Sequence, residues 1–331
     1  MKISKHNIII LLSLICPLLI IACSSFAPLP NETNNEVLFE SFSISRDMKG
    51  DKVGANIDYY LSKPSLEKNY PIVILVGGST DKEHIDSIAS FHKYFTKQLS
   101  QNNLGAVSVD GWGVNLNHTN ESEFMKHYTR TQILSNYQQV ITYLKKNPPT
   151  GWNGKLAVLG VSEGGPIATQ LNEQNQAILA TVLWSGAINS SWRDTLWLDM
   201  YEVYNKVCIP QKNPVNDCYD IATKDVFESR IDYALINPSP ESYFFNMTNM
   251  YVADGVNFPT PNYQKLHGDI LVVTGAKDTI IDSSDTFVKN ANINHLSIEY
   301  WRVESMDHSI RNHPDLIDNS FVWLSNRLNS N

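Results

Sequence analysis

The sequence predicts an α/β protein in which a mostly parallel central sheet has helices on both faces and a mainly helical cap is inserted late in the chain. Three observations support this fold class. Strand-like apolar runs alternate with segments of helical period, two strand candidates joined by a turn precede the alternation, and about 80 residues interrupt it. The 331 residues are 42% hydrophobic, which is enough for one large core or two modest ones.

The strand candidates are short runs rich in aliphatic residues. The first two flank a turn at residues 49–51 and give the sheet an antiparallel start, whereas the alternation that follows favours parallel pairing. Ligands of such sheets bind beyond the carboxyl ends of the strands. The candidates are Val37 to Ser43, Ala55 to Leu61, Ile72 to Val76, Gly105 to Val109, Leu156 to Leu159, Ala180 to Trp184, Ile270 to Thr274 and Leu296 to Val303.

Three helices are predicted from apolar residues that recur on one face. The first has Ile85, Ile88, Phe91, Phe95 and Leu99, the second Leu134, Tyr137, Val140, Ile141 and Leu144, and the third, beginning near Pro314, Leu316, Phe321, Leu324 and Leu328.

The interruption covers residues 187–267 and is rich in aromatic residues. It is too long for a plain connection within a compact domain. We therefore expect residues 187–267 to form a mainly helical cap on a core made of residues 37–186 and 268–331. Most of the aromatic residues are expected to form the cap's own core.

The N-terminal segment has the features of an export signal. Residues 1–22 carry two lysines followed by a long apolar run, and residues 20–23, "IIAC", resemble a bacterial lipobox. The resemblance implies cleavage before Cys23, lipidation of that cysteine and, because Ser24 and Ser25 follow, an outer-membrane location in the cell envelope. An ordinary cleaved signal and an uncleaved anchor are the alternatives. Residues 23–36 are expected to be a polar tether.

Charge and hydropathy restrict the partners. Removing residues 1–22 removes two lysines and no acidic residue, so the formal net charge changes from −8 to −10. This balance argues against a nucleic-acid partner. No later stretch is apolar for long enough to cross a bilayer, so membrane contact is expected only through lipidated Cys23.

Two of the four cysteines are expected to pair. Cys16 lies in the signal segment and Cys23 would carry lipid, which leaves Cys208 and Cys218. An oxidising compartment favours a disulfide between them, and closing so short a loop contributes about 3 kcal/mol in the chain-entropy model. The alternative, a metal-binding pair, lacks companion ligands nearby.

The stretch "LAVLGVSEGGPIAT" places Ser162 between Gly160 and Gly164, where a strand pattern changes to a helix pattern. A nucleophilic serine must present its hydroxyl on a sharp strand-to-helix turn, which requires small flanking residues. The glycines meet that need, and Pro166 fits the first helical turn. The alternative is an ordinary turn serine.

In this context the chain resembles the α/β-hydrolase fold family over about residues 37–329. The resemblance implies a catalytic serine, acid and histidine in that order along the chain. "ILVVTGAKDTIID" places Asp278 just beyond a strand in the G-x-x-D form, with Asp282 as the second candidate for the acid. His308 follows the last strand, and His313, directly before Pro314, is its competitor.

The resemblance also implies an oxyanion hole. One donor is expected to be the backbone N–H of Glu163, whose side chain is assigned no catalytic role. The other is expected from the loop "VGGST", most simply Ser79 with Gly78 as the alternative. Asp110 to Gly113 match a structural Asp-x-x-Gly turn of the family, and Trp112 could line the pocket or pack against its neighbours.

Metal and dinucleotide motifs are absent from the sequence, so no cofactor is expected. The expected function is a serine hydrolase that cleaves small-molecule carboxylic esters through an acyl-serine intermediate. An acyl thioesterase or a peptidase with the same triad is the alternative, and a non-catalytic binding lipoprotein is a third. The cap offers acidic residues and no arginine cluster, which favours neutral acyl groups over strongly anionic substrates.

Overall fold

The computed structural model describes residues 39–46, 56–64, 68–80, 84–209, 218, 221–244 and 247–329. The expected signal peptide, the tether with Cys23 and the turn at residues 49–51 lie outside the described residues. Among the helices that are described, none is long and apolar enough to span a membrane.

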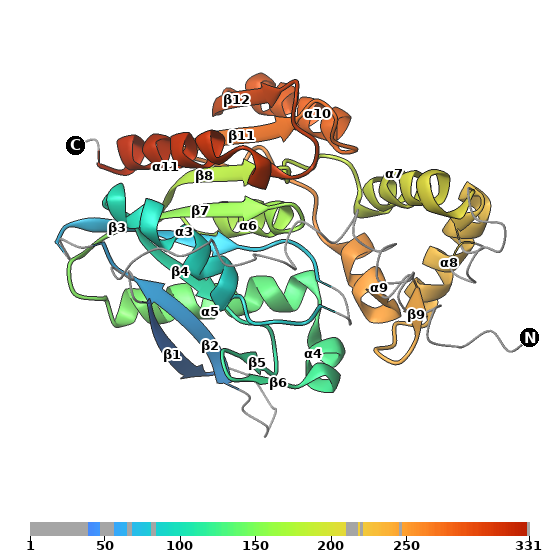
Figure 1. Ribbon diagram of the computed structural model, residues 1–331, viewed down its shortest axis with the longest axis horizontal. Coiled ribbons are helices and arrows are strands. Elements are labelled where there is room, and N and C mark those ends of the chain that lie inside the picture. The colour runs from blue at the N-terminus through green and yellow to red at the C-terminus, as the bar shows by residue number, and fades with distance from the viewer. Residues whose placement is uncertain are drawn as a thin grey trace, which may run out of the picture.

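An eight-stranded sheet forms the centre of the molecule, in the order β1-β2-β4-β3-β7-β8-β11-β12 (Figure 1). The pairs β1–β2 and β2–β4 are antiparallel, and the remaining neighbours are parallel. The predicted, mostly parallel sheet with an antiparallel start is confirmed. The strands are β1 (Phe39–Ser45), β2 (Asn56–Ser62), β3 (Tyr70–Val76), β4 (Gly105–Val109), β7 (Trp152–Val161), β8 (Ile178–Trp184), β11 (Asp269–Gly275) and β12 (Ser297–Val303).

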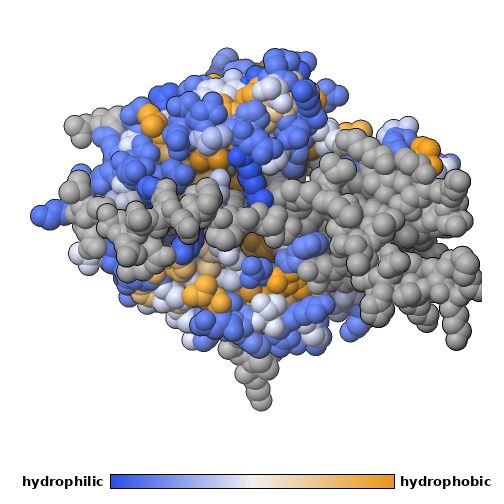
Figure 2. All heavy atoms as spheres, in the orientation of Figure 1, coloured by the Kyte–Doolittle hydropathy of each residue, from blue (hydrophilic) through white to orange (hydrophobic). Residues whose placement is uncertain are grey.

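Helices cover both faces of the sheet. Alternate residues of a strand point to opposite faces, so Ile72 and Ile74 pack on the side of α5 (Arg130–Lys146), α6 (Gly164–Gln174) and α10 (Ile281–Ile293). Val73 and Leu75 pack on the other side, with α3 (Ala89–Gln101) and α11 (Pro314–Asn329). Figure 2 shows that hydrophilic residues cover most of the visible face over α10, α11 and β12, with small separate hydrophobic patches.

Helix α3 begins later than the apolar pattern predicts: Ile85 and Ile88, which the pattern places on the helix, lie before its first residue. Asp110 Oδ1 accepts the Ile88 N–H at 2.7 Å, and Ser87 Oγ accepts the Ala89 N–H at 3.1 Å. These side chains satisfy backbone donors that have no partner within a helix. They fix the first turn at Ala89.

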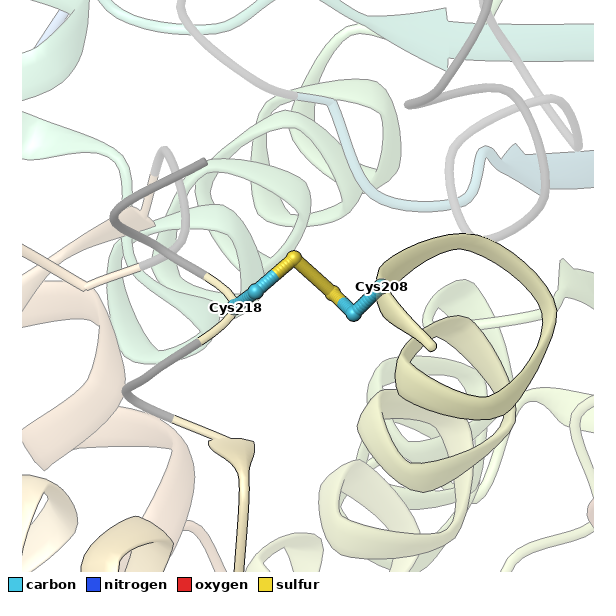
Figure 3. Close-up of a disulfide and its surroundings, with 2 residues drawn as sticks. All are labelled: Cys208 and Cys218. Carbon is cyan, nitrogen blue, oxygen red and sulfur yellow. A yellow bond between two sulfur atoms is a disulfide. The ribbon is translucent and has the colours of Figure 1, made fainter. Parts of the chain in front are cut away.

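The described residues between β8 and β11 form three helices, a short π-helical turn and a small hairpin, which lie together to the right of the sheet in Figure 1. Their buried residues form one cluster with Phe124 and Met125 of α4 (Glu121–His127). Cys208 and Cys218 form a disulfide within this interval (Figure 3). The elements are α7 (Trp192–Val203), η1 (Tyr204–Cys208), α8 (Lys224–Ile236), β9 (Tyr243–Phe244), β10 (Met247–Thr248) and α9 (Asn249–Asn257).

Three short elements complete the part of the chain that the structure describes. Strands β5 (Val114–Asn115) and β6 (His118–Thr119) form a two-stranded ribbon before α4, and the 3₁₀ turn η3 (Ile310–Asn312) precedes α11.

Candidate active site

The structure brings together Ser162, His308 and Asp278, which come from the carboxyl ends of β7, β12 and β11. Ser162 Oγ lies 2.8 Å from His308 Nε2. His308 Nδ1 lies 3.0 Å from each carboxylate oxygen of Asp278. The three groups form a continuous hydrogen-bonded relay at the sheet edge where open α/β sheets place their ligands.

Ser162 occupies a strained turn. Its φ of 52° is in the left-handed region, which costs a residue with a side chain about 1–2 kcal/mol. The backbone passes this point only because glycines flank it. A Cβ at Gly160 would lie 2.4 Å from the carbonyl oxygen of Gly164, and one at Gly165 would lie 2.0 Å from that of Gly186.

A second close approach brings the loop that carries Asp278 against the loop that carries His308. A Cβ at Gly275 would lie 2.2 Å from the Met306 carbonyl oxygen, so glycine lets the loops after β11 and β12 touch. The Lys277 N–H donates to that same oxygen at 3.1 Å. Asp278 is buried, with 4% of its surface exposed, and one of its oxygens also accepts the Ile280 N–H at 3.1 Å.

The two competing candidates lie elsewhere. Asp282 is exposed in the first turn of α10, and His313 occupies the joint between η3 and α11. Neither takes part in the hydrogen bonds that join Ser162, His308 and Asp278.

His308 lies in a strongly negative environment. Burial by itself lowers its pKa, but the carboxylates of Asp278, Asp199 and Asp307 outweigh burial and raise the pKa from 6.5 to about 9. Asp199 belongs to α7, and its Oδ1 accepts a hydrogen bond from Thr279 Oγ1 at 2.5 Å. The side chain of His308 keeps 29% of its surface exposed.

The expected oxyanion donors lie on two segments in contact. A Cβ at Gly164 would be 2.4 Å from the carbonyl oxygen of Val76 and 2.5 Å from that of Gly77. The loop of residues 77–80, hereafter the oxyanion loop, therefore lies against the turn of Ser162. Within the described residues, neither the Ser79 N–H nor the Glu163 N–H has a hydrogen-bond acceptor.

The side chain of Glu163 takes part in contacts that the sequence analysis missed. Its Oε1 accepts a hydrogen bond from Arg130 Nε at 2.6 Å, and the two side chains are only 8% and 6% exposed. Burial, and then the Glu163 carboxylate, hold the pKa of Tyr251 in α9 well above its ordinary value. No motif signals this set, because its members are separated by 33 and 88 positions in the chain.

The residues of the Asp-x-x-Gly turn contact neighbouring side chains, as expected for a structural turn. Asp110 accepts hydrogen bonds from Tyr60 Oη at 2.5 Å and from Ser87 Oγ at 3.0 Å, and burial raises its pKa to about 7. Trp112 packs between neighbours: its ring stacks on His127 at 3.7 Å, and the Arg46 guanidinium carbon lies 3.9 Å from its centroid. Among the described residues, no group of three or more His, Cys, Asp or Glu side chains could hold a metal ion.

Comparison with known proteins identifies the fold. No family model matches the chain, and no curated protein matches its sequence. An esterase from Pyrococcus furiosus superposes with a TM-score of 0.57 at 12% identity, covering 90% of this chain and 96% of the esterase. The 2,6-dihydroxy-pseudo-oxynicotine hydrolase gives 0.54 at 16% identity, covering 88% of this chain and 68% of the hydrolase.

The acylaminoacyl peptidase from Pyrococcus horikoshii is similar over a smaller share of its length. Its TM-score is 0.52 at 15% identity, and the match covers 87% of this chain but only 40% of the peptidase. The sheet order, the helices on both faces and these superpositions show that the chain has the α/β-hydrolase fold.

Proposed function

We propose that this protein is a serine hydrolase that cleaves carboxylic esters through an acyl-serine intermediate on Ser162. The observation that carries the proposal is the relay of Ser162, His308 and Asp278, with separations of 2.8 and 3.0 Å, on a strained strand-to-helix turn. The structural neighbours, which include esterases, support the same class of chemistry.

In the proposed mechanism, neutral His308 accepts the Ser162 hydroxyl proton on Nε2 while Oγ attacks the substrate carbonyl carbon. Asp278 orients the imidazole and stabilises the imidazolium. The tetrahedral intermediate then collapses: its bond to the leaving-group oxygen breaks, and His308 returns the proton to the departing alcohol. Water repeats the sequence on the acyl-enzyme and releases the carboxylic acid and free Ser162.

The negative charge that develops on the carbonyl oxygen requires donors that are in place beforehand. The backbone N–H groups of Ser79 and Glu163 are assigned this role, because they lie on the two adjoining segments and have no acceptor among the described residues. The N-terminus of α6 adds a favourable dipole beside Ser162.

The test of the proposal is the turnover of triad variants on a short-chain p-nitrophenyl ester. Because serine and histidine act as a unit, Ser162→Ala, His308→Ala and the double variant should each lose several orders of magnitude in kcat/KM, and their losses should not add. Asp278→Asn should also be badly impaired.

His313→Ala is the matched control and should stay near the parental rate, and circular dichroism confirms folding. A folded Ser162→Ala protein with parental turnover would remove the proposed mechanism. Graded acyl chains, thioesters and aminoacyl amides assayed in parallel separate an esterase from a thioesterase or a peptidase.

The cap and the anchor belong to the same proposal. Residues 187–267 would cover the site and select the substrate, since α7 and α9 contribute side chains next to it. The "LLIIAC" sequence supports lipidation of Cys23 and attachment to the cell envelope.

Fatty-acid labelling of cells tests the anchor. The parental protein should incorporate the probe and fractionate with membranes, whereas Cys23→Ser should do neither. Equal labelling and fractionation of the two proteins would exclude a lipid anchor on this cysteine.

A further inference from the structure

The segment of residues 128–131, hereafter the hub, lies at the junction of the oxyanion loop, the Ser162 turn and the cap. It joins α4 to α5: Tyr128 ends the first helix, Thr129 caps the second, and Arg130 is the first residue of the second. Each contact of the hub leads to a different part of the molecule.

The first contact reaches the oxyanion loop. The Thr80 N–H donates to Tyr128 Oη at 2.9 Å, and Thr80 Oγ1 donates to the His84 carbonyl oxygen at 2.7 Å. Thr80 is thus held through both its backbone and its side chain. This hydrogen bond to Tyr128 restrains the peptide between residues 79 and 80. It therefore also restrains Ser79, whose backbone N–H, in the adjoining peptide, is the proposed donor.

The second contact reaches the other side of the oxyanion hole. Arg130 Nε donates to Glu163 Oε1 at 2.6 Å, and both side chains are buried. The charged hydrogen bond restrains the residue whose backbone N–H is the second proposed donor, because such bonds are stronger than those between neutral groups.

The third set of contacts reaches cap helix α9. The Tyr251 ring stacks on Tyr128 with 5.0 Å between centroids and 2° between planes. Asp254 Oδ2, one turn further along α9, accepts the Thr131 N–H at 3.1 Å. Trp192 of α7 packs edge-on against Tyr251 at 5.8 Å, which ties the second cap helix to the same place.

We propose that the hub is a positioning element, with Tyr128 as its central residue, through which cap helix α9 holds both donor segments of the oxyanion hole in catalytic geometry. The inference rests on the proposed serine hydrolase function. None of the hub side chains is assigned contact with the reacting atoms. They act through Ser79 and Glu163.

The experiment compares Tyr128→Phe, which removes the acceptor of the Thr80 N–H and keeps the ring, with Asp254→Ala, which breaks the contact to α9 at a distance from the oxyanion loop. The full-length protein is assayed on a short-chain p-nitrophenyl ester and titrated with a trifluoromethyl ketone. Ser162 Oγ adds to the carbonyl carbon of this ketone, and the resulting oxyanion lies where the tetrahedral intermediate has one.

Removing a whole oxyanion donor costs about 10²–10³ in kcat, so misplacing one should lower kcat about 10-fold or more. For Tyr128→Phe we expect that loss with KM within about twofold of parental, because the donor acts on the transition state and not on the bound substrate. Affinity for the ketone should fall by a similar factor. Asp254→Ala should move kcat and ketone affinity in the same direction by a smaller factor.

Tyr233→Phe, at an exposed tyrosine of α8, is the matched control and should behave as the parental protein. If Tyr128→Phe does not fold, Asp254→Ala alone decides the question. A folded variant with parental kcat and parental ketone affinity would overturn the positioning role. Failure of the underlying function would appear differently. The single variant Ser162→Ala would then keep its turnover of the ester.

Discussion

His308 is surrounded by more negative charge than one aspartate provides. Asp278 contacts its Nδ1, Asp307 precedes it in the chain, and Asp199 approaches from α7. A histidine acts as a general base only in its neutral form. Each carboxylate stabilises the imidazolium, so in the ligand-free enzyme the proton must be removed before Ser162 can be activated.

The raised pKa of His308 predicts an alkaline activity profile. With the pKa at about 9, the imidazole is protonated at neutral pH and becomes neutral as the pH rises through that value. The value of kcat/KM for a neutral ester should therefore increase with pH, with an inflection well above 6.5. Asp199→Asn removes one of the charges that raise the pKa, so its inflection should move towards lower pH.

The measurement is kcat/KM from pH 5 to about 10 for the parental protein, Asp199→Asn and the exposed control Asp194→Asn, which belongs to the same helix. Asp194→Asn should match the parental curve. An identical inflection in all three proteins would show that Asp199 does not set the protonation of His308.

At the scale of the element, the turns that present the site could be predicted from the sequence because their requirements are local. The strand before Ser162, the glycines around it and the proline after it occur within one short stretch, and Asp278 and His308 each lie in the loop that follows a predicted strand. Steric limits on close approach decide such positions, and those limits depend on residues next to one another in the chain.

The contacts that the sequence did not reveal join elements distant in the chain. Tyr128 meets Thr80 from 48 positions away, and Thr279 meets Asp199 from 80 positions away. The first pair forms only when the segment between α4 and α5 meets the loop after β3, and the second only when α7 has docked beside the loop after β11. The periodicity of a helix carries no information about its partner. The start of α3 at Ala89 has the same cause, since Asp110 comes from the loop after β4.

At the scale of the whole molecule, the segment between β8 and β11 meets α5 and the Ser162 turn around a buried ion pair. The Arg130 guanidinium carbon lies 5.5 Å from the Trp192 ring centroid and 5.7 Å from that of Phe258, while its Nε bonds to Glu163. Glu163 Oε2 has no hydrogen-bond partner among the described residues. The Arg130 guanidinium compensates the charge of this buried carboxylate.

Arg130→Met tests how far the fold depends on this pair. The variant keeps an unbranched side chain but leaves Glu163 charged and buried, so the free energy of unfolding should fall by about 3–5 kcal/mol. Arg130→Met with Glu163→Gln removes both charges and should lose less than the sum of the single changes. Urea unfolding followed by circular dichroism gives the free energy of unfolding of Arg130→Met, Glu163→Gln and the double variant.

The matched control is Arg193→Met, because Arg193 pairs with Glu228 and Asp232 between α7 and α8 while 27% of its side chain stays exposed. Solvent screens such pairs, so this change should cost about 1 kcal/mol or less. If Arg130→Met were no more destabilising than Arg193→Met, or if the two changes at Arg130 and Glu163 were additive, the buried pair would not hold α5 and the segment between β8 and β11 together. The docking would then rest on the stacked aromatic rings of Tyr128, Tyr251 and Trp192.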